Sequence, residues 1–450
     1  MADAIERGTG AGAAIPDLNR RWAWLAAAAA GGGTLLFILA PLSAPILMAT
    51  SMIVPLAACW TATGGLPALR LSQPLVILCI AEVYLLIGTT WSLSPKTAYS
   101  STALLLVFIV ALIATSGALK GMREDALRGM AQGFAAAWVA GSIFLLFERI
   151  TGLWGHRMLL SYFPTLHSGA FRGMTLRDGW VLTMDPYLLN RNMAAAALLL
   201  WPAALVLNRL NTRGDRRILP VLGLVPAAIA IALSEHATSQ MAVAGAAVIY
   251  GFARLSLNRT RVAVAVAWTI ATMLVVPLTS GLYASGLYRA DWLPFSFRHR
   301  IVLWGYTSAQ VRKAPILGAG IGAAHVLSRD KDHKAARAPG SEIVLSTGWH
   351  SHNGYLQTWY EAGAVGAVLL LAFGLALLRD IGRTAADIQP FALAVFSACA
   401  LTAGTSFSIW QPWFVASMGL AAVITLAAVE FATRQAGGVM HPSRLVPGKT

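Results

Sequence analysis

Apolar runs close to twenty residues long recur along nearly the whole 450-residue chain, and they limit most strongly what it can fold into. A helix needs about 20 apolar residues to cross a bilayer. The composition agrees, because 57% of the residues are hydrophobic and only 12% are charged, whereas roughly a quarter are charged in a soluble domain. The runs are continuous rather than alternating, which favours helices over β-barrel strands. The sequence therefore predicts an all-α integral membrane protein.

We predict about twelve transmembrane helices, at residues 22–42, 45–63, 74–92, 100–118, 128–147, 192–208, 218–234, 238–253, 262–282, 363–379, 388–408 and 412–433. The predicted organisation is an N-terminal tail at 1–21, helices 1–5 within 22–147, a first long loop at 148–191, helices 6–9 within 192–282, a second long loop with the start of the next helix at 283–362, helices 10–12 within 363–433, and a C-terminal tail at 434–450.

Basic residues predict the orientation of these helices, since short cytoplasmic loops carry an excess of lysine and arginine. Clusters such as 209–217 and 254–261 fall on alternate connections, whereas the short loops on the other side hold almost only Lys96. Both termini are then cytoplasmic, and both long loops face outward. The formal net charge of +15 partly reflects these anchors. Nothing resembles a nucleic-acid-binding motif, so DNA and RNA are not expected partners.

The second long loop is basic, with nine lysines and arginines against four acids between Tyr283 and His352. Long translocated loops escape the orientation rule, so topology does not explain this charge. Two interpretations explain the positive charge: the loop binds an anionic ligand, or it is a solvated surface near anionic head groups. Within the loop, apolar positions at helical spacing from Arg300 to Pro315 predict a short helix along the membrane surface. The LGAGIG stretch from Leu317 to Gly322 predicts a tight turn rather than a nucleotide-binding loop, because no strand precedes it.

Two pairs in this loop could suggest a metal. They are the histidines of His350-x-His352 and the carboxylates of Asp330-x-Asp332. No third zinc-type ligand follows the histidines at useful spacing. The aspartates lie among lysines, which favours a solvated charged loop. We therefore predict no metal and no cofactor.

His352 is the strongest candidate for chemistry. It precedes an apolar run, and a helix beginning there would place Tyr355, Trp359 and two glycines, Gly363 and Gly366, on one face below it. A neutral imidazole at the outer bilayer surface can accept a proton from a hydroxyl group. The alternative from composition is an interfacial histidine with a structural hydrogen bond.

Three arginines are candidates for binding an anion. Arg191 lies at the outer start of the sixth span, where free backbone amides and the helix dipole already favour negative charge. Arg298 and Arg300 flank the start of the predicted surface helix, and Arg300 is preferred because it heads the apolar run directly. Glu82 lies near the middle of a span, where an acid is either functional or part of a buried pair.

Together these residues resemble the O-antigen ligase superfamily. His352-Asn353, then Gly363 after nine residues and Gly366 after two more, is similar to its histidine signature. Asn190-Arg191-Asn192 is similar to its outward arginine, and Arg300-x3-Trp304 with Pro315 and LGAGIG is similar to its large periplasmic loop.

The resemblance implies a metal-independent glycosyltransferase of the GT-C type in the bacterial inner membrane, with its active site on the periplasmic side. The donor would be undecaprenyl-diphosphate-linked O-antigen, the acceptor lipid A-core, and membrane lipids would surround both. His352 would be the general base, Arg191 with Arg300 or Arg298 would bind the diphosphate, and Asn353, Trp304 and Tyr355 would contact substrate.

Three other functions stay open. An O-antigen polymerase of the same superfamily would use a second lipid-linked glycan as acceptor, and a protein O-oligosaccharyltransferase would use a serine or threonine. From a different class, many spans could describe a lipid-linked glycan transporter, although no internal repeat or pair of broken helices is visible in the sequence.

Overall fold

The computed structural model describes residues 14–69, 71–166, 173–211, 218–328 and 336–439, and these are mostly helical. The helices and strands are α1 (Ala14–Leu39), η1 (Pro41–Ser43), α2 (Ala44–Thr50), α3 (Ile53–Thr63), α4 (Gln73–Gly88), α5 (Pro95–Gly121), α6 (Glu124–Ile150), α7 (Trp154–Tyr162), η2 (Pro164–Leu166), β1 (Met174–Arg177), β2 (Trp180–Met184), η3 (Pro186–Leu189), α8 (Asn190–Leu210), α9 (Ile218–Ala232), α10 (Ala237–Leu255), α11 (Leu257–Met273), α12 (Val275–Ala284), η4 (Leu287–Arg289), α13 (Phe295–Val311), α14 (Ala323–Leu327), α15 (Gly354–Ile381), α16 (Gln389–Thr405) and α17 (Pro412–Val439).

Every predicted span falls on a helix of the structure. Among the described residues, seven candidate spans are long and apolar enough to cross a membrane: α1, η1 to α3, α5, α6, η3 with α8, α15 and α17. An eighth is the pair α11 and α12 if the two helices, bent by 65°, form one broken span. The other predicted spans fall on α4, α9, α10 and α16, of which α4, α9 and α16 are apolar but shorter. This is an all-α membrane architecture with seven or eight full-length candidate spans.

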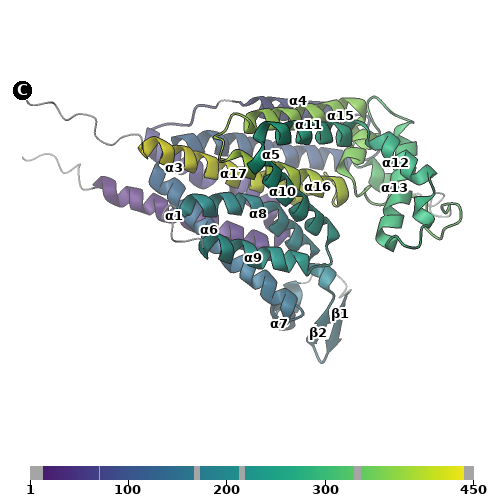
Figure 1. Ribbon diagram of the computed structural model, residues 1–450, viewed down its shortest axis with the longest axis horizontal. Helices are drawn as coiled ribbons and strands as arrows, with labels where there is room; N and C mark the ends of the chain where they lie inside the picture. Colours follow the sequence, from purple (N-terminus) through teal and green to yellow (C-terminus); the bar gives the residue numbers. More distant parts are fainter. Residues whose placement is uncertain (1–13, 70, 167–172, 212–217, 329–335, 440–450) are drawn as a thin grey trace, which may run out of the picture.

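The helices of the bundle run roughly along one direction, and the elements of the two long loops project from it at two separate places (Figure 1). The start of α1 and the end of α17 lie at the left end in that view. The right end carries α12 and α13, whereas α7 and the antiparallel pair of β1 and β2 lie at the bottom of the view. This hairpin is a small addition to the predicted all-α fold. Both predicted loops therefore lie away from the end of the bundle that carries the start of α1 and the end of α17.

Helix α8 is the centre of the bundle. Its candidate span is 83% buried, and every residue from Asn192 to Leu207 is buried. A helix that is apolar on all sides must be surrounded by other helices or by lipid. Around it, α1 and α6 pack unusually closely, because Gly129 and Gly133 leave room for the backbone of α1; a Cβ on either would overlap the carbonyl of Ala23 or Ala27. Small residues four positions apart permit such contact in membranes.

Helix α13 differs from the predicted surface helix. It begins at Phe295 rather than Arg300 and ends before Pro315. Residues Ile301 to Gly305 are buried consecutively, so the helix is enclosed on all sides at its centre. Its neighbours include α12 and α15. A helix lying on lipid would keep one polar, solvated face, whereas α13 is packed into the protein.

Helix α15 is broken at Gly363, where φ is +63° and ψ is −164°. The break frees backbone groups that a continuous helix would pair internally. The amides of Ala364 and Val365 instead donate to the carbonyls of Pro315 and Ile316, at 2.9 and 3.3 Å. A chain break inside an apolar helix is tolerated when other protein groups satisfy the backbone.

The glycine-rich stretch from Leu317 to Gly322 forms further backbone hydrogen bonds with α15, now as the donor. The amides of Ala319 and Gly320 donate to the carbonyls of Tyr360 and Glu361, each at 2.9 Å. Gly318 and Gly320 both have positive φ, and a Cβ on them would overlap the Glu361 backbone or Ser92. The LGAGIG motif is therefore a structural plug that fills the break in α15 and joins it to the end of α13.

We predict that Gly363→Ala destabilises the protein. Alanine rarely adopts this φ, and its Cβ would overlap the Ile316 carbonyl oxygen, so we expect a loss on the order of 1–3 kcal/mol. Thermal unfolding of the detergent-solubilised protein would show a lower Tm. The matched control is Gly281→Ala, where nothing lies within 4 Å of the added Cβ. Equal Tm values for the two variants would contradict the claim that the LGAGIG stretch packs into the break at Gly363.

Candidate functional site

His352 lies just before α15 rather than within its first turn. Asn353 is the N-cap, and its side-chain oxygen accepts a hydrogen bond from the Leu356 amide at 3.1 Å. An N-cap of this kind satisfies one of the free amides of the first turn. The local structure thus explains why asparagine follows histidine: Asn353 caps the start of α15, and His352 lies just outside that end of the helix.

The His352 ring is held in one tautomer. Its Nδ1 lies 2.9 Å from the backbone oxygen of Ser406, which can only accept, so Nδ1 carries the proton. In the neutral ring Nε2 then has a free lone pair, and it makes no hydrogen bond to any residue that the structure describes. The backbone of His352 has φ +52°, a left-handed conformation that is uncommon for residues other than glycine and is often found at functional sites.

The surroundings keep this ring neutral. Burial, and after it the neighbouring His350, whose ring centroid is 4.1 Å away, and the charge of Arg300, lower the pKa of His352 to about 3. Burial and Arg300 also depress the pKa values of His299 and His350. A charged guanidinium thus lies near several imidazoles that remain uncharged at neutral pH.

Arg300 is the cation in the cluster that it forms with His299, His350 and His352. It is partly buried, and burial lowers its pKa. It makes no hydrogen bond or ion pair with any other residue in the described part of the chain. Arg298 differs, because its guanidinium donates to Asp291 at 3.0 Å. A partly buried charge without a counter-charge is costly, and among the described residues Arg300, unlike Arg298, has no acidic partner.

Trp304 and Tyr355 lie in the packing around this cluster. Both are buried; the Trp304 indole donates to the Ser351 carbonyl at 2.9 Å, and the Tyr355 hydroxyl donates to the Ala400 carbonyl at 2.8 Å. Trp304 therefore ties α13 to the residue that precedes His352, and Tyr355 ties α15 to α16. These contacts fix the positions of Arg300 and His352 relative to each other.

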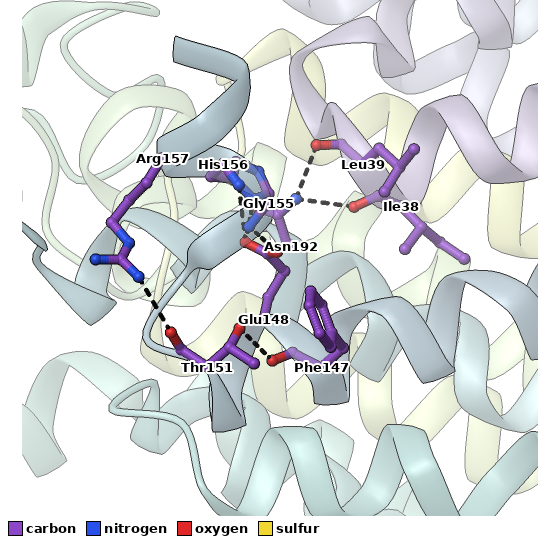
Figure 2. A network of polar contacts seen from close by, with 9 residues as sticks. All are labelled: Ile38, Leu39, Phe147, Glu148, Thr151, Gly155, His156, Arg157 and Asn192. Atoms are coloured by element: carbon purple, nitrogen blue, oxygen red, sulfur yellow. Dashed lines mark hydrogen bonds and ion pairs between the residues drawn. The ribbon is translucent and has the colours of Figure 1, made fainter. Parts of the chain in front are cut away.

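Arg191 lies in the first turn of α8, exposed, and it forms no hydrogen bond or ion pair with the residues that the structure describes. The structure does not bring it into contact with His352 or Arg300. Its neighbour Asn192 is buried and donates to the carbonyls of Ile38 and Leu39, which anchors the start of α8 to the end of α1 (Figure 2).

Figure 2 also shows how the loop before α8 is fixed. The buried carboxylate of Glu148 accepts from the amides of Gly155 and His156 and pairs with His156 Nδ1 at 2.7 Å. These contacts satisfy free amides at the start of α7. Arg157 donates to the Thr151 carbonyl at 3.4 Å. Glu148 therefore has a structural role that the sequence did not reveal.

The remaining candidates do not join the cluster. Glu82 is buried in α4, and one of its carboxylate oxygens has no partner among the described residues. Asp330 and Asp332 fall outside the described residues. Within the described part of the chain, no three histidine, cysteine, aspartate or glutamate side chains are arranged to hold a metal ion.

Two residues near His352 were not predicted. Ser406 supplies the carbonyl that orients the ring, and the buried His236 contacts the Ser406 hydroxyl at 3.3 Å. His236 lies in a short polar segment between two apolar helices. This placement is the one feature of the sequence that could have marked His236 as a candidate.

We predict that acidification destabilises the protein through these histidines. Their pKa values in the folded state lie below the ordinary 6.5, so the unfolded chain binds more protons as the pH falls below about 6.5. Their contribution to stability is complete above that pH and is lost below it. Thermal unfolding should show a Tm that falls between pH 7.5 and 5.5, and falls less in His352→Gln. A Tm independent of pH in this range would contradict the burial of neutral rings.

Residues 222–371 match the family model for O-antigen ligase. The match runs from within α9 into α15 and contains Arg300 and His352 but not Arg191. No curated protein matches the chain. Proteins of this family are glycosyltransferase-like membrane enzymes, which agrees with the apolar helices of the bundle. The segment that carries His352 and Arg300 is similar to the O-antigen ligase family, and this match supports the resemblance of the chain to the O-antigen ligase superfamily.

Proposed function

We propose that the protein is an O-antigen ligase of the bacterial inner membrane. It transfers O-antigen from undecaprenyl diphosphate to a sugar hydroxyl of lipid A-core at the periplasmic face and so completes lipopolysaccharide. The observation that carries this proposal is that a partly buried Arg300 lies near a neutral His352, and that neither the Arg300 guanidinium nor the His352 Nε2 has a hydrogen-bond partner among the described residues.

Arg300 binds the donor's diphosphate in this proposal. A guanidinium can form two parallel hydrogen bonds with phosphate oxygens and stays charged at any physiological pH. During transfer the leaving diphosphate gains negative charge, and a fixed cation nearby stabilises that charge. No nucleotide sugar is present outside the cytoplasm, so a lipid diphosphate is the leaving group that the donor itself brings.

His352 is the general base. The acceptor hydroxyl oxygen attacks the donor's anomeric carbon while its proton moves to Nε2, and the bond from that carbon to the diphosphate oxygen breaks with its electron pair. The Nδ1 hydrogen bond to Ser406 stabilises the imidazolium that forms. A single displacement of this kind inverts the anomeric centre. Because the low pKa makes His352 a weak base, proton transfer accompanies the attack rather than preceding it.

Arg191 is proposed as a second contact to the donor or to an acceptor phosphate. Its support is local: it is exposed and unpaired among the described residues, at the start of a long helix. The basic second loop would attract the phosphates of lipid A-core. Both substrates are anchored in the bilayer, so a site at its edge allows them to meet without leaving the membrane.

We predict that His352→Ala abolishes ligation. Removing a general base costs about 10²-fold or more. Wild type and variant would be expressed in a Gram-negative strain that lacks its own ligase but makes compatible donor and core, and lipopolysaccharide would be resolved on a gel. Wild type should restore long-chain lipopolysaccharide, and an equally abundant variant should leave glycan on the lipid carrier. Full activity of the variant would refute the base role, and longer carrier-bound glycan from wild type without ligation would favour a polymerase.

We predict different effects for the two neighbouring arginines. Arg300→Ala should weaken donor binding by about tenfold or more, because a charged hydrogen bond to the diphosphate is lost. Arg298→Ala is the matched control and should change donor affinity by less than about twofold, since an exposed ion pair such as that with Asp291 contributes little. Binding of lipid-diphosphate-linked glycan to the purified proteins is the measurement. The reverse order of effects would assign the anion site to Arg298.

A further inference from the structure

His236 is a buried, titratable side chain that lies within the segment matched by the family model but outside the His352-Asn353 motif. It lies between α9 and α10, and 9% of its surface is exposed. Both ring nitrogens are engaged: Nδ1 lies 2.7 Å from the Ser239 hydroxyl, and Nε2 lies 3.3 Å from the Ser406 hydroxyl. The ring also packs against Phe407, with centroids 5.5 Å apart. The imidazole is thus held in one orientation by two hydroxyls and an aromatic ring.

Ser406 connects this imidazole to His352. Its hydroxyl contacts His236, while its backbone oxygen accepts the proton of His352 Nδ1 at 2.9 Å. Ser406 lies just after α16, with φ −133° and ψ −96°, so no helical hydrogen-bond ladder fixes the direction of its carbonyl. A carbonyl in such a position needs other contacts to keep its orientation.

The adjacent backbone is tied to the same helix. Thr238, in the first turn of α10, donates to the Thr405 carbonyl at 3.3 Å. The start of α10 therefore holds the chain at the end of α16 through two consecutive residues. Phenylalanine or leucine could fill this volume without a buried polar group that needs a partner. The presence of a histidine with both nitrogens hydrogen-bonded therefore indicates that its polar contacts have a role beyond packing.

We propose that His236 is a positioning residue that fixes Ser406, so that the Ser406 carbonyl orients His352 and directs its Nε2 toward the acceptor hydroxyl. This inference rests on the proposed function of His352 as the base. His236 acts through Ser406 and touches neither substrate. Its loss lowers the rate of transfer and leaves substrate binding almost unchanged, because a misdirected base affects the chemical step alone.

The experiment is a double-mutant cycle in the purified protein, with kcat and KM measured for transfer from lipid-diphosphate-linked glycan to lipid A-core. His236→Phe keeps the ring but removes both polar atoms, and Ser406→Ala keeps the carbonyl but removes the hydroxyl. Each single variant should lower kcat by about tenfold, with KM changed by less than about twofold. The double variant should be no slower than the slower single variant, because both changes break one link.

His236→Gln supplies the rescue, since its amide can place a polar atom near the Nε2 position; most of the wild-type kcat should return. Ser285→Ala is the matched control, because that exposed hydroxyl donates only to the Leu282 carbonyl of its own helix; it should keep wild-type kcat. Thermal unfolding verifies that each variant is folded, and if His236→Phe does not fold, Ser406→Ala and His236→Gln carry the test.

Wild-type kcat in folded His236→Phe, or in Ser406→Ala, would overturn the inference. Effects that multiply in the double variant would also overturn it, because they would show that His236 acts independently of Ser406. An active His352→Ala would instead refute the proposed base. An inactive His352→Ala beside a fully active His236→Phe would refute only the positioning role.

Discussion

The candidate site depends on the exchange of backbone hydrogen bonds between α15 and the segment from Pro315 to Gly320, which includes part of the glycine-rich stretch. Inside a membrane bundle each unpaired amide or carbonyl costs several kcal/mol, so the break at Gly363 can persist only with the glycine-rich plug in place. The four amides of Ala319, Gly320, Ala364 and Val365 cross between the two segments. Since the plug follows α13 and the break lies in α15, this exchange also ties the segment after α13 to α15.

The site separates two electrostatic tasks between neighbouring side chains. Arg300 keeps a positive charge that no described residue neutralises, while burial and that same charge keep the surrounding imidazoles neutral. One group can therefore attract an anion while another accepts a proton at the same pH. Had Arg300 been paired with a carboxylate, as Arg298 is with Asp291, its field on the histidines would be largely cancelled.

Local patterns in the sequence predicted much of this arrangement. The length of the apolar runs located the helices, and the spacing after His352 identified the segment that the family match contains. The criterion of length and hydropathy gives seven or eight full spans among the described residues rather than twelve, because α4, α9 and α16 are short and α10 does not meet the criterion. The sequence could not reveal that α13 is enclosed by protein, because an enclosed short helix and a surface helix can share one apolar pattern.

Other features depended on contacts between distant parts of the chain. The choice between Arg298 and Arg300 rests on which one meets Asp291, and both residues precede the same apolar run. His236 and Ser406 are 170 positions apart, so their contact has no periodic signal. The LGAGIG stretch can act as a plug only because it packs against the break at Gly363. The spacing of residues within the motif does not predict this long-range contact.

The central claim is that a neutral histidine, His352, and a nearby arginine, Arg300, perform a single displacement. The most direct measurement is the anomeric configuration of the new glycosidic bond, determined by NMR on the product of the purified protein with a donor of known configuration. The account predicts that the configuration at the transferred sugar is inverted relative to its bond to the diphosphate. A retained configuration would contradict it, because retention requires a covalent or otherwise two-step route that His352 and Arg300 do not provide.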